Sequence, residues 1–305
     1  MQQVAPVAPM PVWEMRPLQP LGQISDQDPD ATLPLALCSI AFAHDANMLP
    51  SPPDLVLVSS DGVHFYIQSP VLLSASTNMF NALVFERKQT DTHIISVPEA
   101  SAVINVLLHA AYLMSCAPYQ PGARVLLDAL DAFPSYGLSF GEHLAPSTPF
   151  YDAVQLALPD APMDFYLIAA EHDLAPFARA AARHLDEFEV TQISEAQMQR
   201  MGVLYYNRLI AMLGRRASAV KQLLRSPPDG HPYSALCAEE DQQVLRDAWV
   251  LTASQFTTDL FKNTSSEVIV AQIRLLRSSL VCTDCRDAVT DRLQSLQAQL
   301  HELDQ

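Results

Sequence analysis

The residues best suited to chemistry in this sequence are four candidate metal ligands in its C-terminal part. Cys282 and Cys285 form a CxxC pair, and His231 and Cys237 precede that pair by two predicted helices. Zinc prefers four nitrogen and sulfur ligands in a tetrahedron, and a CxxC turn presents two of them together. The set therefore predicts a structural zinc ion that fastens the connector 229–238 to the start of the last helix. The alternative is that the cysteines are reduced and pack as small hydrophobic side chains.

A second pattern, Gly137-Leu138-Ser139-Phe140-Gly141, matches the GxSxG of the nucleophile elbow. That elbow needs a strand that turns sharply into a helix beside an oxyanion hole. Here a helical segment ending at Pro134 precedes the motif, and Pro146 follows a few residues later. We therefore predict that Ser139 lies in a loop and is not catalytic. With only eight glycines, the sequence also lacks phosphate-binding loops, so we assign no catalytic residue, no cofactor-binding residue and no small-molecule substrate, and we predict that the protein is not an enzyme.

The charge of the chain argues against general nucleic-acid binding. Its 34 acidic and 18 basic side chains give a net charge of −16. The range 200–225 is an exception, because it carries basic side chains and no acidic one: Arg200, Arg208, Arg215, Arg216, Lys221 and Arg225. This segment either neutralises acidic neighbours within the fold, which its two-sided charge distribution favours, or docks an acidic partner.

The composition predicts a protein of the cytoplasm, the nucleus or both. We expect no secretory signal, because the start lacks a basic region followed by an uninterrupted apolar one. The longest apolar stretch, at 33–43, is far shorter than the roughly 20 residues that a membrane span needs, so we expect no membrane association. Five cysteines, an odd number, favour a reducing compartment.

The elements that must position these residues follow from hydrophobic periodicity. Residues 54–68 alternate around Asp61-Gly62 as a β-hairpin does. Two short helices, a strand at 93–98 and a long apolar helix at 99–114 follow. Residues 1–33 are rich in proline and predict a disordered arm, and the glycines and prolines of 115–162 predict an insertion that contains a helical segment at 124–133.

The remainder is predicted to be helical. A helical segment at 163–188 is split by Pro176, and further helices are expected at 194–225, 239–261, 265–281 and 286–303. Thr264 and Glu267 form a capping-box pattern before the third of these four. The last helix carries apolar residues at alternating spacings of four and three, for which packing against the chain's own bundle is favoured over a coiled coil: Val289, Leu293, Leu296, Leu300 and Leu303.

The order of elements, together with the stretch "DLVLVSSDGVHFYIQSPVLLSASTNMFNALV", resembles a BTB/POZ domain. The positions that match the family's pattern are Asp54, Phe65, Leu72, Ser76 and Phe80, and the stretch around Ala170 and Leu174 is similar to the family's later helix pair. Residues 200–300 resemble the helical tail of basidiomycete-type fungal BTB proteins, through "MGVLYYNRLIAMLGRRASAVKQLL", "PPDGHPY", "DAWVLTAS" and "CTDCRDAVTDRL". The resemblance implies an α+β fold, with a small sheet flanked by helices at 34–190, followed by an all-α extension at 191–305.

The resemblance also implies a function through protein–protein contacts. A homodimer is expected, with the apolar segment 33–44 as its candidate interface and with these residues in it: Leu35, Leu37, Ile40 and Phe42. Gln68 and Ser69 stand where repressor-type members carry a histidine and a basic residue, so the partners stay unidentified. The alternative is a substrate adaptor of a cullin-3 ubiquitin ligase, although no hydrophobic-x-Glu element follows the long helix at 115–121. A third hypothesis is an enzyme that depends on zinc or on the GxSxG serine.

Overall fold

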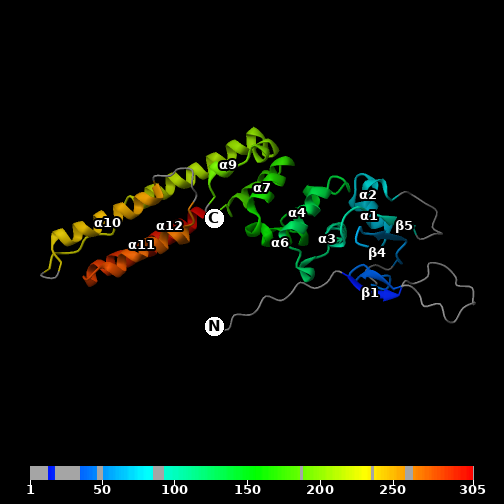
Figure 1. Ribbon diagram of the computed structural model, residues 1–305, viewed down its shortest axis with the longest axis horizontal. Coiled ribbons are helices and arrows are strands. Elements are labelled where there is room, and N and C mark those ends of the chain that lie inside the picture. The colour runs from blue at the N-terminus through cyan, green and yellow to red at the C-terminus, as the bar shows by residue number, and fades with distance from the viewer. Residues whose placement is uncertain are drawn as a thin grey trace, which may run out of the picture. The chain divides into compact units, whose positions relative to one another are not determined.

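The computed structural model describes residues 13–17, 35–46, 51–84, 93–185, 188–234, 237–257 and 264–304. The chain divides into two compact units, residues 1–161 and 162–305 (Figure 1). Most of the segment 1–33, which was predicted to be a disordered arm, lies outside the described residues. Its residues 13–17 depart from that prediction, because they form a strand whose hydrogen-bond partners come from a second strand far along the chain.

A five-stranded sheet organises the N-terminal unit. Its strands are β1 (Trp13–Pro17), β2 (Leu35–Ser39), β3 (Leu55–Val58), β4 (Val63–Ile67) and β5 (His93–Ser96), and they lie in the order β1-β2-β4-β3-β5. The β1–β2 and β3–β4 pairs are antiparallel, whereas β2–β4 and β3–β5 are parallel. The predicted hairpin is confirmed, with Leu57 opposite Phe65 and Gly62 at a φ of +81° in its turn, a conformation that glycine adopts without strain.

Asp61 in that turn joins the hairpin to the long helix of the unit. Its carboxylate accepts hydrogen bonds from the hydroxyl of Ser59 (2.6 Å) and from the backbone N–H (2.9 Å) and hydroxyl (2.7 Å) of Ser101. Ser101 is the first residue of α3, so Asp61 satisfies a donor that the helix start leaves free. The hairpin turn therefore fixes where α3 begins.

Helices fill the rest of the N-terminal unit. They are α1 (Ser69–Ala75), α2 (Met79–Ala82), α3 (Ser101–Ala111), α4 (Ala123–Ala132), α5 (Phe140–His143) and α6 (Pro149–Ala157), with 3-10 turns at Ala117–Tyr119 and Leu158–Asp160. The α3 helix packs against α1, α4 and α6, and ten of its eleven residues are buried: Ser101, Val103, Ile104, Asn105, Val106, Leu107, Leu108, His109, Ala110 and Ala111.

The segment 115–162, predicted as an insertion, contributes to the core of this unit. Phe133, Tyr136 and Leu138 are buried, and the ring of Tyr136 packs against that of Phe80 with centroids 4.6 Å apart. Each large apolar side chain of this kind contributes about 1.5–3 kcal/mol when it is fully buried. Glycine and proline composition therefore marked turns between packed helices here, rather than a segment outside the core.

One short element departs from right-handed geometry. Met79, Phe80, Asn81 and Ala82 of α2 all have positive φ angles, between 53° and 60°. Such residues cost roughly 1–2 kcal/mol each when they are not glycine. The turn is held by Asn78, whose Oδ1 accepts the backbone N–H of Asn81, and by the complete burial of Phe80.

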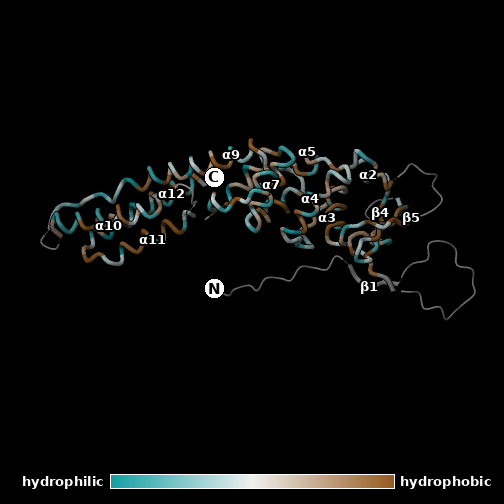
Figure 2. The backbone as a smooth tube through the Cα atoms, turned by 45° about the horizontal axis from the view of Figure 1, so that its top comes forward, coloured by the Kyte–Doolittle hydropathy of each residue, from teal (hydrophilic) through white to brown (hydrophobic). Residues whose placement is uncertain are grey.

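In its described part the C-terminal unit is built from helices and the connectors between them. It consists of α7 (Pro162–Glu171), α8 (Ala175–Ala182), α9 (Glu195–Leu224), α10 (Glu239–Thr257), α11 (Ser266–Ser279) and α12 (Thr283–Asp304), with a 3-10 turn at Val190–Gln192. Helix α7 packs against α8 and α9, α10 against α9 and α11, and α12 against α11 and α9. Figure 2 shows brown and teal alternating along α9 to α12, as expected for helices that bury one face.

The apolar seam of the last helix packs inside this bundle, as predicted. Val289, Leu293, Leu296 and Leu300 belong to one core cluster with Trp249 of α10 and Ile273 of α11, whereas Leu303 is exposed. The expected α+β class is confirmed at this level: a small sheet with helices, followed by an all-helical unit.

Two helix starts and one helix end explain the boundaries of the bundle. Ser194 and Gln197 form a full capping box at α9, which was not among the predicted caps. At α11 the cap is Ser265, not the predicted Thr264, and it accepts the N–H of Val268. Helix α9 ends before Pro227-Pro228, and its last carbonyls are satisfied from other helices, since Trp249 Nε1–H donates to Leu224 O (2.9 Å).

Candidate metal centre

The four predicted ligands meet at one point in the C-terminal unit. One ligand atom from each of His231, Cys237, Cys282 and Cys285 lies within 4.8 Å of the other three. His231 Nε2 lies 3.2 Å from Cys285 Sγ and 3.4 Å from Cys282 Sγ, and Cys237 Sγ lies 3.6 Å from Cys285 Sγ. All three cysteines are free thiols. The group can therefore hold a metal ion.

Two of the ligands come from the connector between α9 and α10. Ser234 and Cys237 exchange two backbone hydrogen bonds (3.0 and 3.2 Å), and Cys237 is buried in the core cluster of the unit. The backbone carbonyl of His231 accepts a hydrogen bond from Gln242 Nε2 (2.9 Å), and Gln242 is itself buried on α10. Hydrogen bonds therefore hold the backbone of the connector at both ligands, His231 and Cys237.

The other two ligands come from the start of α12. Cys282 stands directly before the first residue of that helix, and Cys285 lies within its first turn. The carbonyl of Cys282 accepts the backbone N–H of Arg286 (3.2 Å), and Arg286 Nε–H donates to Leu280 O (2.7 Å). Because a CxxC at a helix start places both side chains on one turn, the two thiols point to the same site.

The hydrogen bonds of the imidazole set which nitrogen faces the thiols. His231 Nδ1 lies 2.8 Å from the carbonyl oxygen of Pro232, which can only accept, so Nδ1 carries the proton and Nε2 has a free lone pair. This carbonyl is the partner that metal-binding histidines commonly have on their second nitrogen. It raises the pKa of His231, and the Cys282 charge adds to that effect.

The thiols differ in their electrostatic environment. Burial raises the pKa of Cys285 to about 12 and raises that of Cys237. Hydrogen bonds from the backbone N–H of Cys285, and then of Asp284, lower the pKa of Cys282. A bound cation would deprotonate all three, because a coordinating thiol loses its proton outright.

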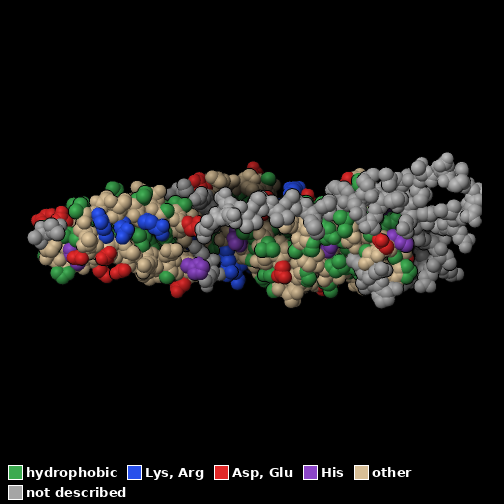
Figure 3. All heavy atoms as spheres, turned by 90° about the horizontal axis from the view of Figure 1, so that it is seen from below, with side chains coloured by type: hydrophobic (Ala, Val, Ile, Leu, Met, Phe, Trp, Pro, Cys, Tyr) green, Lys and Arg blue, Asp and Glu red, His purple; other side chains and the backbone are tan. Residues whose placement is uncertain are grey.

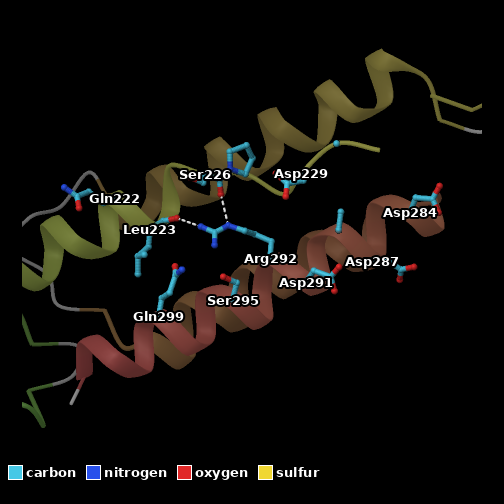
Figure 4. A pocket seen from close by; sticks show the side chains of 13 residues that line it. Gln222, Leu223, Ser226, Asp229, Asp284, Asp287, Asp291, Arg292, Ser295 and Gln299 are labelled. Carbon is cyan, nitrogen blue, oxygen red and sulfur yellow. Dashed lines mark hydrogen bonds between the residues drawn. The ribbon is translucent and has the colours of Figure 1, made fainter. Parts of the chain in front are cut away.

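An acidic groove of about 690 Å³ runs beside the metal centre, between the end of α9 and α12 (Figure 4). Asp284, Asp287 and Asp291 of α12 line one wall, and Asp229 of the connector lies opposite. Arg292 crosses the groove and donates to Leu223 O (2.5 Å) and Ser226 O (3.0 Å), which holds the end of α9 onto α12. Its guanidinium also lies 5.9 Å from the ring centre of the buried Trp249.

The GxSxG motif lies where no nucleophile elbow can form. Ser139 precedes the four-residue helix α5 and follows a turn after α4, with no strand before it. Gly137 has a φ of +67°, and its carbonyl accepts the N–H of Thr77, so the motif serves as the contact between α2 and the end of α4. The prediction that Ser139 lies outside a strand–turn–helix context is confirmed.

The residues that carried the family resemblance have structural roles. Asp54 accepts hydrogen bonds from the backbone N–H (2.7 Å) and hydroxyl of Ser69, so it caps α1 from a distance. Gln68 is buried and bonds to Tyr112 and to Ser51 O. Phe65, Leu72 and Phe80 are fully buried in the core. The Ser76 hydroxyl donates a hydrogen bond to Tyr136 O (2.7 Å).

The predicted interface residues lie in and after β2, a strand inside the sheet. Leu35 and Leu37 belong to β2, between β1 and β4. Ile40 follows it and is 39% exposed, whereas Phe42 is 0% exposed and its ring contacts those of Phe65, His109 and Tyr112. Of these four positions, Phe42 therefore packs within its own chain, and Ile40 offers its side chain to solvent.

The cationic segment in α9 is partly neutralised within its own unit. Arg200 pairs with Glu171 (2.7 Å), and Arg216 donates to Thr264 O and to the Ser266 hydroxyl. Figure 3, which views the molecule from below, shows Lys and Arg side chains with Asp and Glu side chains near them.

In comparison with known proteins, no protein-family model matches the chain, and no curated protein does. Among the described helices, none combines the length and the apolar character that crossing a membrane requires.

Proposed function

We propose that His231, Cys237, Cys282 and Cys285 bind a structural zinc ion. In a tetrahedral site with Zn–S of about 2.3 Å and Zn–N of about 2.0 Å, neighbouring sulfurs lie about 3.8 Å apart and nitrogen–sulfur pairs about 3.5 Å. The separations of 3.6 Å between Cys237 and Cys285 and of 3.2 and 3.4 Å from the imidazole are close to these values. This agreement, with three soft thiols and one oriented imidazole, carries the proposal.

The ligand set makes the site closed. Three thiolates and one imidazole fill a tetrahedron, so no position is left for water or substrate, as is usual for structural zinc. The ion would join the connector to the start of α12, two segments that otherwise meet through Arg292 and the core cluster. Structural zinc contributes an apparent ~10–16 kcal/mol of binding free energy at neutral pH in small zinc domains, so we expect the attachment of the connector to α12 to depend on it.

Elemental analysis of the purified full chain tests this proposal. We expect one zinc ion per chain in the wild type, a large loss in Cys285→Ser, and full occupancy in Cys116→Ala. Cys116 is a suitable control because it is buried in the N-terminal unit. A wild-type chain that contains no zinc, and takes none up when it is supplied, would show that the proposal is wrong.

We further propose that the chain is a non-enzymatic protein-interaction module of BTB/POZ type that homodimerises and recruits protein partners. The support is the order of the β3–β4 hairpin, α1, α2, β5 and α3, together with the match of Asp54, Leu72 and Phe80 to structural positions of the N-terminal unit. The GxSxG context described above favours a non-catalytic role.

Light scattering tests the dimer. Because β2 lies inside the sheet, deletion of 33–44 would disrupt the fold, and a surface substitution is the better probe. We expect a dimer for the full chain and a shift toward monomer in Ile40→Glu, with Ile94→Glu on β5, also exposed, as the matched control. A wild-type chain that is monomeric at all concentrations contradicts the proposal, and retention on immobilised cullin-3 would favour the adaptor function instead.

A further inference from the structure

We propose that Cys282 is an oxidation site for hydroperoxides, and that its oxidation produces a Cys282–Cys285 disulfide and releases the metal. The inference rests on the proposed zinc site and adds a reaction to it. It follows from the unequal exposure of the three thiols, from their mutual distances and from the position of Cys282 at a helix start.

Exposure selects the sulfur that a peroxide can reach. Cys237 and Cys285 are 1% and 4% exposed, whereas Cys282 is only partly buried. Oxidation of cysteine follows thiolate character together with access. In the proposed site, coordination keeps Cys282 a thiolate, and Cys282 stands directly before the first residue of α12. Among the three ligand thiolates, Cys282 is therefore the one that a peroxide in solution can reach.

Distance selects the thiol that resolves the oxidised sulfur. The Sγ atoms of Cys282 and Cys285 lie within 4.8 Å of each other, and residues three apart on one helical turn have Cα atoms about 5–5.5 Å apart, inside the range that a disulfide accepts. Cys285 can approach by side-chain rotation. Cys237 would have to bring the connector with it, because its backbone exchanges two hydrogen bonds with that of Ser234.

The reaction balances without any further reactant. The Cys282 thiolate attacks one oxygen of the hydroperoxide, an S–O bond forms, the O–O bond breaks, and the departing alkoxide or hydroxide takes a proton from water. The Cys285 thiolate then attacks the sulfenic sulfur, an S–S bond forms, the S–O bond breaks, and hydroxide leaves into the solvent. Two thiolates lose two electrons in total, the hydroperoxide gains them, and zinc leaves as the unchanged divalent ion.

The consequence is local release of the connector. With two of its four ligands in a disulfide, the metal retains only His231 and Cys237. Arg292 still holds the end of α9 onto α12, and the apolar seam of α12 stays in the core. The connector keeps the Gln242–His231 hydrogen bond but loses the metal as its link to α12. Oxidation therefore weakens the attachment of the connector and leaves the bundle folded.

The test uses the full chain loaded with zinc. Hydrogen peroxide is added, zinc release is followed with a chromogenic chelator, and a sulfenic-acid trap followed by peptide mapping identifies the first oxidised cysteine. We expect one zinc released per chain, the trapped adduct on Cys282, a Cys282–Cys285 disulfide at the end point, and zinc uptake again after reduction. A first adduct on Cys237 or Cys285, a Cys237–Cys285 disulfide, or zinc retained while a reference thiol is oxidised overturns the proposal.

A variant separates the role of this sulfur from that of the site. Cys282→His keeps a ligand atom but removes the oxidisable one, so peroxide-driven zinc release should slow roughly tenfold or more, whereas Cys116→Ala should behave as wild type. If Cys282→His binds no zinc, the trap and disulfide map of the wild type decide alone. Wild-type protein that never holds zinc contradicts the zinc proposal itself, whereas zinc that is held but not released contradicts this inference only.

Discussion

Replacing Gly137 with alanine should destabilise the N-terminal unit by about 2–5 kcal/mol, clearly more than the same change at Gly62. Both glycines have positive φ, +67° and +81°. A left-handed conformation alone costs a non-glycine residue roughly 1–2 kcal/mol. Since a Cβ at Gly62 would meet nothing within 4 Å, that first cost is all we expect there.

Gly137 carries a second cost, because its surroundings are closed. A Cβ there would lie 2.8 Å from the backbone nitrogen of Asn78 and would also overlap its side-chain amide. Asn78 cannot turn away freely, since its Nδ2 donates to Ser135 O and its Oδ1 accepts the N–H of Asn81. Overpacking of this kind costs typically 1–3 kcal/mol, and added to the conformational cost it gives the expected 2–5 kcal/mol.

Urea unfolding of the two alanine variants measures the difference. We expect the free energy of unfolding of Gly137→Ala to be lower than that of Gly62→Ala by about 1–3 kcal/mol, read from midpoints at an unchanged urea dependence. Equal losses, or a larger loss at Gly62, would refute the close approach of the α2 turn to Gly137. The comparison also tests the claim that this part of GxSxG is a packing contact.

Three further predictions concern pH, backbone strain and the metal. Burial holds the pKa of His143 and of His109 below the usual 6.5, so below about pH 6.5 the unfolded chain binds more protons than the folded one. The free energy of unfolding, measured with urea, should therefore be highest above about pH 6.5 and decrease as the pH falls below that value. The decrease should be smaller in His143→Phe. Ala82→Gly should stabilise by up to ~1 kcal/mol, because Ala82 has a φ of 55°. Chelation of zinc should speed deuterium exchange in the connector and early α12, but not in the β3–β4 hairpin.

Each of these three has a contradicting result. Urea midpoints that stay constant between pH 7.5 and 5.5 would contradict the neutral burial of the two histidines. A loss of stability in Ala82→Gly, as in an ordinary helix, would contradict the left-handed turn. Unchanged exchange in the connector after complete metal removal would show that the ion does not hold it.

Local chemistry explains which elements were predictable. An Asp-Gly turn between alternating residues needs only its own few residues, and the β3–β4 hairpin follows. The four metal ligands could be predicted because histidine and cysteine are residue types that bind zinc and because two of the cysteines have CxxC spacing. Their approach to within 4.8 Å depends on how α9, α10 and α12 pack, which no local pattern encodes. Gln242 and Pro232, which orient His231, carry no sequence signal at all.

Tertiary contacts explain the rest. Residues 13–17 form a strand because β2 supplies their partners, and 115–162 joins the core because Tyr136 and Phe133 fill space beside α2 and α6. The α11 cap is Ser265 instead of the neighbouring Thr264, since two adjacent hydroxyl residues offer the same pattern one residue apart. Phe42 looked available in an apolar run, yet the rings of α3 and β4 cover it.

X-ray absorption at the zinc edge, on the purified full chain, tests the central claim most directly. We expect a four-coordinate shell with three sulfur ligands at about 2.3 Å and one nitrogen ligand at about 2.0 Å, from Cys237, Cys282, Cys285 and His231. A shell dominated by oxygen and nitrogen, or one that keeps three sulfurs in Cys285→Ser, would contradict it.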